Sequence, residues 1–220
     1  MEKLNYEVLN KCGYEGYILR DAPEKIMQFG EGNFLRAFVD YWFDMANEKV
    51  GWNGKAVLVQ PIPTGLTKMI NDQEGLYTLY LRGSEKGRKV DDRRVISSVS
   101  RCLNPYEPEG FESMMKLAES DDLAYVVSNT TEAGIVYDPS CQFEDKPASS
   151  FPGKLTQVLY HRYQAGKGPR LSYDEILDGE LEKRLAKTDI GTVKLSAGDD
   201  VKQLIFSLAM FNTISKPPGF

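Results

Sequence analysis

The chain has 220 residues, enough for one well-buried domain and a short appendage, and its 41% hydrophobic and 27% charged residues are typical of a soluble globular protein. Its 27 basic and 32 acidic residues give a formal net charge of −5 without a basic run, which argues against a nucleic-acid surface. The sequence has no apolar run of the about 20 residues that a membrane span needs, and we expect no signal peptide. Three widely spaced cysteines argue against disulfides or a zinc site and favour the cytoplasm: Cys12, Cys102 and Cys141.

The first predicted elements form a βαβ unit. Residues 25–29 predict a buried strand that enters the glycine turn at residues 30–33. Apolar residues at helical spacing then predict a helix from about Asn33, followed by a second strand at 56–59, parallel to the first. Three aromatic residues of this helix are expected in the core rather than at a cofactor: Phe34, Phe38 and Trp42.

The segment from residue 75 to 102 has a different pattern. Two β-rich stretches, 76–81 and 95–99, flank a polar turn at 83–87 and predict an antiparallel hairpin, either inserted in the α/β domain or extending its sheet. A short helix, a buried strand and a longer helix follow: 111–118, 123–127 and from about 151.

A composition break at residues 164–169 suggests the end of the α/β domain. Beyond it, apolar spacing predicts helices at 176–185 and from about 199, with an acidic pair at the start of the second. We therefore expect one α/β domain over residues 1–168 and a short, mostly helical tail of unknown role over 169–220.

The glycine turn lies between a predicted strand and a predicted helix, which is the context of a dinucleotide-binding loop. Glycine lets a diphosphate approach the backbone, and the helix N-terminus offers free N–H groups and a partial positive charge. Leu35 takes the place of the third glycine of G-x-G-x-x-G, so a merely structural turn is the alternative. The candidate cofactor-binding residues here are Gly30, Glu31, Gly32, Asn33 and Phe34.

Two further strand ends supply candidates. Gln60 follows the second strand, where an acidic residue usually binds the adenosine ribose; it leaves the choice between NAD and NADP open. After the strand at 123–127 come Ser128, Asn129 and Thr130 as cofactor-binding candidates and Glu132 as a substrate-binding candidate. The alternative is a polar loop whose side chains cap the next segment.

Arg36 and Lys154 are the candidate cations for a phosphate or a substrate carboxylate. Arg36 lies in the first turns of the helix after the glycine turn, with a solvated or structural ion pair as the alternative. Lys154 lies at a helix start, where a buried lysine could meet a substrate carboxylate; an exposed lysine in the first helical turn is the alternative. His161, the single histidine, is expected at the surface rather than as a catalytic base. We predict no metal site.

Four segments resemble, in the right order, the mannitol dehydrogenase (polyol-specific long-chain dehydrogenase) family: 26–38, 72–78, 127–135 and 150–156. The resemblance covers about residues 20–165 and is closest to the branch of the family that acts on hexonates. It implies a Rossmann-like NAD-binding domain with an inserted antiparallel hairpin, NAD as cofactor, and a small sugar acid of hexuronate metabolism as substrate.

The catalytic set of that family is missing. Its members carry a Lys, followed by Asn and His, in a helical second domain, and no Lys-x4-Asn-x2-His pattern occurs here. Hydride transfer also needs a group that moves a proton to or from the carbinol oxygen. We therefore expect a cofactor-binding half that is inactive unless a second chain supplies the catalytic residues. A non-catalytic nucleotide- or sugar-acid-binding module and a partial gene product are the alternative hypotheses.

Overall fold

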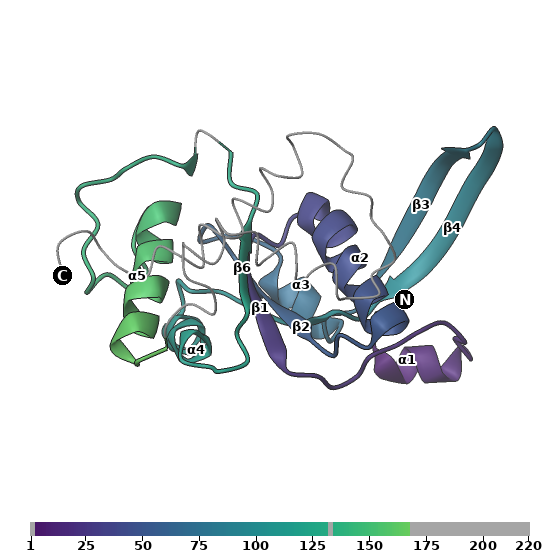
Figure 1. The fold of residues 1–220 in the computed structure, drawn as a ribbon, viewed down its shortest axis with the longest axis horizontal. Helices are drawn as coiled ribbons and strands as arrows, with labels where there is room; N and C mark the ends of the chain where they lie inside the picture. Colours follow the sequence, from purple (N-terminus) through teal and green to yellow (C-terminus); the bar gives the residue numbers. More distant parts are fainter. Residues whose placement is uncertain (1–2, 132–133, 168–220) are drawn as a thin grey trace, which may run out of the picture.

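A computed structural model describes residues 3–131 and 134–167 of the chain (Figure 1). A parallel sheet lies between two layers of helices, and a two-stranded ribbon projects from one side. The elements, in chain order, are α1 Tyr6–Lys11, β1 Glu24–Phe29, α2 Asn33–Val50, β2 Lys55–Val59, α3 Thr67–Asp72, β3 Tyr77–Glu85, β4 Arg88–Ile96, β5 Val99–Leu103, α4 Pro108–Ala118, β6 Tyr125–Ser128 and α5 Phe151–Gln164.

The sheet has the strand order β5-β2-β1-β6, with every neighbouring pair parallel. The chain moves outward from β1 to β2 and β5, then returns and places β6 on the other side of β1. Met27 of β1 therefore pairs with Val57 of β2 on one side and Val126 of β6 on the other. This order confirms the predicted Rossmann-like α/β fold. The direction in which successive strands are added to the sheet reverses at β1, between β2 on one side and β6 on the other.

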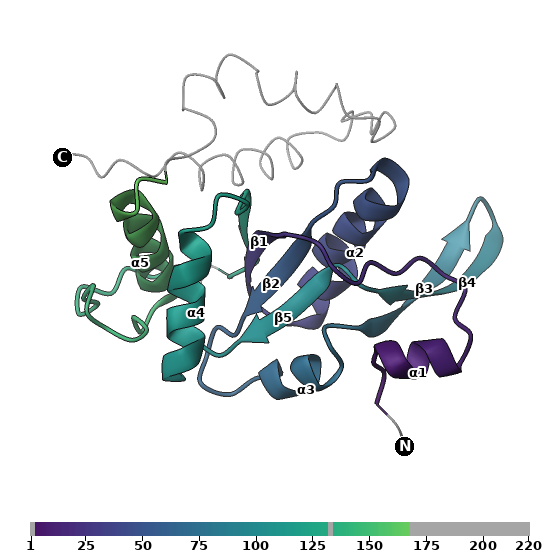
Figure 2. The ribbon, with the colours of Figure 1, turned by 90° about the horizontal axis from the view of Figure 1, so that it is seen from below.

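Both faces of the sheet are buried, because side chains alternate along each strand. Met27 and Phe29 point to the face covered by α4 and α5, whereas Ile26 points to the face covered by α2 and α3. Figures 1 and 2 show these two helix layers on opposite sides of the sheet. The first layer also brings the start of α5 to the end of β1, where Phe151 packs edge-on against Phe29 with 5.4 Å between ring centroids.

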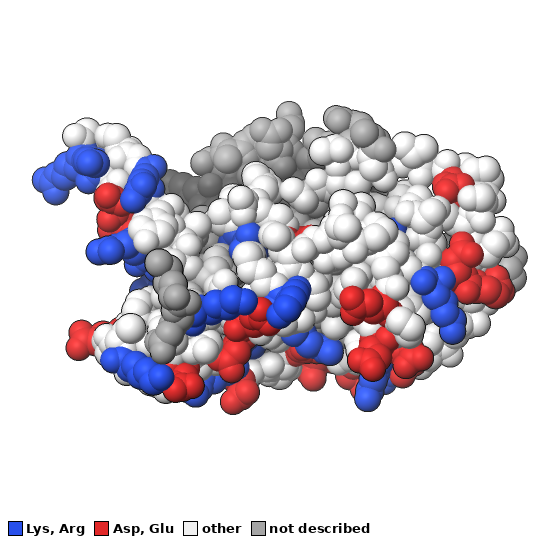
Figure 3. Space-filling model, turned by 180° about the vertical axis from the view of Figure 1, so that it is seen from behind, with Lys and Arg blue, Asp and Glu red and all other residues white. Residues whose placement is uncertain are grey.

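The predicted hairpin is the separate β3–β4 ribbon, which makes no strand pairing with the main sheet. Its strands are longer than predicted, because the turn consists of Lys86 and Gly87 alone, with φ of 49° and 77°, rather than residues 83–87. Val99, expected in the hairpin, instead begins the parallel strand β5. Exposed basic side chains gather at the far end of the ribbon, at the upper left of Figure 3: Arg82, Lys86, Arg88 and Lys89.

Helix α2 corrects one prediction. Phe34, Phe38 and Trp42, expected in the core, are 62%, 44% and 53% exposed. The buried side of the helix holds Asp40 and Asp44 instead, together with Leu35 and Asn47. The reason is that the inner face of α2 binds polar groups of neighbouring loops: Asn47, for example, exchanges two hydrogen bonds with the backbone of Gly54.

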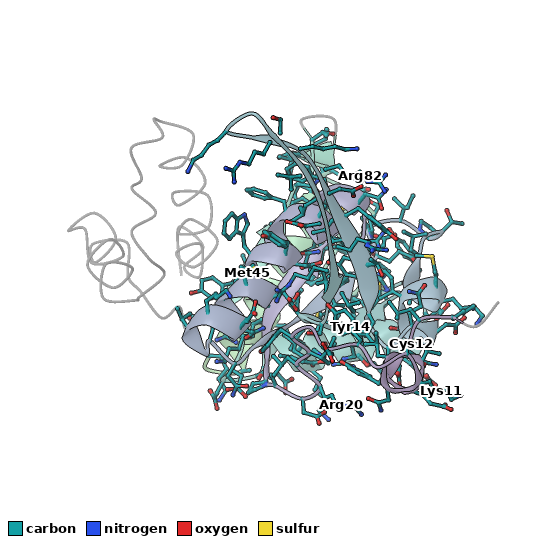
Figure 4. All side chains as sticks on the ribbon, turned by 90° about the vertical axis from the view of Figure 1, so that its right-hand side faces the viewer. Lys11, Cys12, Tyr14, Arg20, Met45 and Arg82 are labelled. Atoms are coloured by element: carbon teal, nitrogen blue, oxygen red, sulfur yellow. The ribbon has the colours of Figure 1, made fainter. Side chains whose placement is uncertain are left out.

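Lys55, the first residue of β2, binds the N-terminal segment at the edge of the sheet where β2 begins. Its side chain is buried, and Nζ donates to the hydroxyl of Tyr6 and to the carbonyls of Leu19 and Arg20. Figure 4 shows Tyr14 and Arg20 of this segment near the base of the ribbon. The six-residue helices α1 and α3 were not predicted.

Several predictions fall on residues that the structure does not describe. The helices expected at 176–185 and from about 199, and with them the proposed tail domain, lie outside the described residues, as does Glu132. Within the described part, no helix is long and apolar enough to cross a membrane.

Candidate functional site

The glycine turn adopts a backbone conformation that other residues rarely reach. Gly30 has φ of +121°, and a Cβ at this residue would lie 3.2 Å from Cδ1 of Leu35. Its N–H donates to the carbonyl of Val59, so the turn is also held to the end of β2. Leu35, at the third-glycine position, is buried and packs against the turn from inside the helix.

The N-terminus of α2 is open to an anion. Its N-cap is Gly32, and no side chain of the described residues caps it. A Cβ at Gly32 would meet nothing within 4 Å, so the backbone there faces open space. The first turn contains no acidic residue, and α2 is 18 residues long. The free N–H groups and the helix dipole therefore favour a negatively charged group at this point.

The loop after β6 lies beside the glycine turn, because β1 and β6 are parallel neighbours that end together at Phe29 and Ser128. Ser128 and Thr130 share a hydrogen bond of 2.6 Å between their hydroxyls, and Ser128 Oγ also accepts from the N–H of Thr130. Asn129 is exposed, and its Oδ1 lies 3.5 Å from the Cβ position of Gly30. The structure thus brings these three candidates to the glycine turn.

Glu31 and Gln60 are buried between the glycine turn and the loop that leads to α3. Glu31 Oε1 accepts from the N–H of Leu66. Gln60 donates to the carbonyl of Ile62 and accepts from the hydroxyl of Thr67. Both side chains therefore hold the loop before α3 against the glycine turn through these hydrogen bonds.

Arg36 is held on the ribbon side of α2. Its Nη2 donates to Oδ1 of Asn33, and its guanidinium lies 5.2 Å from the ring centroid of Tyr77. The Tyr77 hydroxyl in turn donates to the carbonyl of Arg36 at 2.6 Å. Arg36 adds positive charge near the start of α2, on the side that faces β3.

A buried polar group beneath the glycine turn was not predicted from the sequence. Gln28 Nε2 donates to the carbonyl of Gly30 and, at 3.4 Å, to Asp40. Burial raises the pKa of Asp40 to about 7, against the opposing effects of the Gln28 hydrogen bond and the Arg36 charge. Among the described residues, four buried side-chain polar atoms have no hydrogen-bond partner, and three of them lie in this group: Gln28 Oε1, Asp40 Oδ1 and Arg36 Nε. The sequence did hold a signal for this group: Gln28 is a polar residue in an otherwise apolar strand, and Asp40 is an acidic residue among apolar helix residues.

The remaining described candidates lie on α5, whose first residue packs against the last residue of β1. Lys154 is 2% exposed; its Nζ donates to the carbonyl of Ser149 and lies 5.3 Å from the ring centroid of Tyr106. Burial lowers its pKa. His161 lies near the end of α5, where Nε2 is 2.7 Å from a carboxylate oxygen of Glu119, as expected for a surface residue that joins two helices.

The described residues contain no group of three or more His, Cys, Asp or Glu side chains that could hold a metal. What surrounds the glycine turn is a free helix N-terminus, two hydroxyls and an exposed amide. Such groups have the chemistry to bind and orient an anionic, hydroxyl-rich ligand, and they lie at the carboxyl ends of β1 and β6, where the strand order reverses. Fold and site together define a Rossmann-type nucleotide-binding domain.

Comparison with known proteins gives the family. The chain belongs to the mannitol dehydrogenase family, whose Rossmann domain matches residues 24–198. It is 52% identical over 170 residues to altronate oxidoreductase of Phocaeicola vulgatus, a match that covers 77% of this chain and 33% of that protein. It is 47% identical over 173 residues to altronate oxidoreductase of Bacillus subtilis, with 79% and 35% covered. The chain thus spans about a third of the length of these relatives.

A solved structure shows the same fold. Mannitol 2-dehydrogenase of Pseudomonas fluorescens, in a ternary complex with NAD and D-mannitol, matches with a TM-score of 0.62 and 24% identity. The match covers 78% of this chain and 38% of that one.

Proposed function

We propose that this chain is the cofactor-binding part of an NAD-dependent oxidoreductase of the altronate oxidoreductase type, which reduces tagaturonate to altronate with NADH or runs the reverse reaction. The observation that carries the proposal is the uncapped N-terminus of α2 behind Gly30 and Gly32, beside the polar loop after β6. The relatives at 52% and 47% identity support the substrate class.

Each part of the proposed site has a distinct role. The backbone N–H groups of residues 32–34 bind the diphosphate, because the helix start offers donors and positive potential. Ser128, Asn129 and Thr130 bind hydroxyls of the nicotinamide ribose. Glu31 and Gln60 support the wall of the site through their bonds to the loop before α3. When bound, the cofactor would donate a hydride to the substrate or accept one from it.

Proton transfer to the substrate oxygen requires a group outside this site. The buried ammonium of Lys154 donates to the Ser149 carbonyl, and His161 lies beside Glu119, which directly follows α4. We therefore propose that residues 1–168 act as a cofactor domain and that a second chain supplies the catalytic groups and part of the sugar-acid site. A cytoplasmic location fits the cofactor and the three free cysteines.

Calorimetric titration of the full chain with NADH tests the cofactor site, using Gly32→Asp as the variant. An aspartate at the N-cap is a favoured residue, so the variant keeps or gains a few tenths of a kcal/mol in stability. Its carboxylate, however, occupies the open space at Gly32 and repels the diphosphate. We expect the unaltered chain to bind NADH and the variant to lose binding.

The matched control is Gly83→Asp, which adds the same charge on the ribbon, where a Cβ also meets nothing within 4 Å. It is expected to bind NADH like the unaltered chain. Equal affinity in all three proteins contradicts the placement of the diphosphate. No binding by the unaltered chain contradicts the proposal that this part of the protein holds the cofactor by itself.

A further inference from the structure

Gln28 and Asp40 lie directly beneath the glycine turn, and both side chains are fully buried. Gln28 Nε2 donates to the carbonyl of Gly30 at 3.2 Å and to Oδ2 of Asp40 at 3.4 Å, so a single carboxamide separates the Asp40 carboxyl group from the turn. The proposed diphosphate binds the N–H groups of residues 32–34, which follow this turn in the chain. A negative charge on Asp40 therefore acts on the anion through poorly screening, buried surroundings.

The hydrogen bonds of this group are short of one donor. Among the described residues, Gln28 Oε1 and Asp40 Oδ1 are buried acceptors without a partner, whereas Arg36 Nε is a buried donor without one. Even if Arg36 Nε donates to one of these acceptors, the other stays unpaired, and an unpaired buried polar atom costs free energy. One proton on Asp40 adds the missing donor. The imbalance therefore favours the neutral carboxyl group in the folded protein.

The groups that face Asp40 leave its proton equilibrium near neutral pH. Burial raises the pKa of Asp40 to about 7. Hydrogen bonds from Gln28 of β1 and Tyr77 of β3 oppose this rise. On α2 itself, the charge of Arg36 also opposes it, whereas the charge of Asp44 adds to it. A diphosphate bound above the turn raises this pKa further, because a nearby like charge disfavours the ionised form.

We propose that Asp40 takes up a proton from solvent when NADH binds at the glycine turn, so that cofactor binding is coupled to neutralisation of this buried carboxylate. Asp40 acts on the cofactor through Gln28 and the turn, and it is therefore a positioning residue rather than a catalytic one. The inference rests on the proposed function, because it requires the diphosphate at residues 32–34.

Calorimetric titration of the full chain with NADH measures the coupling in two ways. At pH 7.5, titrations in two buffers of different ionisation enthalpy give the number of protons taken up. A coupling of about tenfold, typical of two linked sites, corresponds to about half a proton per NADH at that pH. The same coupling predicts that NADH affinity falls about fivefold between pH 6 and pH 8. Both readouts use the unaltered chain and do not depend on the folding of a variant.

Asp40→Asn assigns the proton, because the amide keeps the shape of the side chain and does not titrate. The variant is expected to bind NADH without proton uptake and with the same affinity at pH 6 and pH 8. The matched control is Asp92→Asn, the same change at an exposed residue of β4. It is expected to keep both the proton uptake and the pH dependence of the unaltered chain.

Two results overturn this inference and leave the proposed cofactor site standing. One is NADH binding by the unaltered chain without proton uptake and with equal affinity at pH 6 and pH 8. The other is unchanged proton uptake in Asp40→Asn, because another group then takes the proton. A third result, no NADH binding at any pH, overturns the proposed function and the coupling together.

Discussion

At the residue scale, the least expected feature is the buried Asp40 beneath the glycine turn. It is fully buried, and its Oδ1 has no partner among the described residues. Its pKa of about 7 means that the folded protein holds a proton that the unfolded chain has released above pH 4. Gln28 connects this carboxyl group to the carbonyl of Gly30, so its charge acts close to the turn.

This raised pKa predicts a pH-dependent stability. Between pH 4 and 7 the folded state binds more protons than the unfolded state, so the free energy of unfolding falls as pH rises through this window. We expect Asp40→Asn to flatten that fall. Relative to the unaltered chain, the variant therefore gains free energy of unfolding at pH 7.5 compared with pH 5. Urea unfolding at the two pH values measures it. An identical pH dependence in both proteins refutes the ionisation of Asp40 as its cause.

At the element scale, a buried ion pair joins the ribbon to α2. Arg94 of β4 donates through Nε to Asp44 at 2.7 Å and through Nη1 to Glu48 at 2.8 Å. The Asp44 side chain is fully buried and also accepts from the N–H and hydroxyl of Ser97. A two-stranded ribbon is marginally stable alone, so this contact fixes its base.

Arg94→Met is therefore expected to destabilise the protein by about 3 kcal/mol, because it leaves the Asp44 carboxylate buried without its cation. The control is Arg82→Met, which removes the exposed pair with Asp91 farther along the same ribbon and is expected to cost less than about 1 kcal/mol. Denaturant unfolding compares the two. Similar losses in both variants would show that the Arg94 pair does not anchor the ribbon.

Patterns of neighbouring residues in the sequence predicted the strands and the helix that hold the site. The wrong predictions, the ribbon turn and the buried face of α2, depend on contacts between residues far apart in the sequence. The unit from β1 to β2 followed from short apolar runs and the glycine turn at residues 30–33, whose geometry is set by neighbours in sequence. The ribbon turn was misplaced because Gly83 and Gly87 both signal turns, and pairing partners decide between them. Helical spacing in α2 identified an apolar face but not whether that face points to the core or to the surface. The opposite face is buried because Asp44 and Asn47 find hydrogen-bond partners there, and these partners come together only in the folded protein.

The candidate site was predicted to a similar extent. The turn at 30–32 and the residues 128–130 were expected at strand ends, and the parallel pairing of β1 with β6 brings them together. Lys154 was a candidate as a buried lysine at a helix start, with an exposed lysine as the alternative, and the structure buries it with Nζ bound to the Ser149 carbonyl. Sequence position alone does not fix the direction of a long side chain.

At the scale of the whole molecule, the chain spans about a third of its altronate oxidoreductase relatives, and the described part offers binding groups rather than a proton-transfer group at the proposed site. We therefore expect no tagaturonate-dependent oxidation of NADH by this chain alone, even where NADH binds. A steady-state absorbance assay at saturating NADH measures this. Turnover by the purified chain contradicts the proposal that the catalytic groups come from a second chain.

The central claim is that the cofactor lies where the strand order reverses. A crystal structure of the full chain grown with NADH tests it most directly. The account predicts the diphosphate over the N–H groups of residues 32–34 and the nicotinamide ribose beside Ser128 to Thr130. A crystal with NADH bound elsewhere, or with the glycine turn free of the cofactor at saturating NADH, contradicts it.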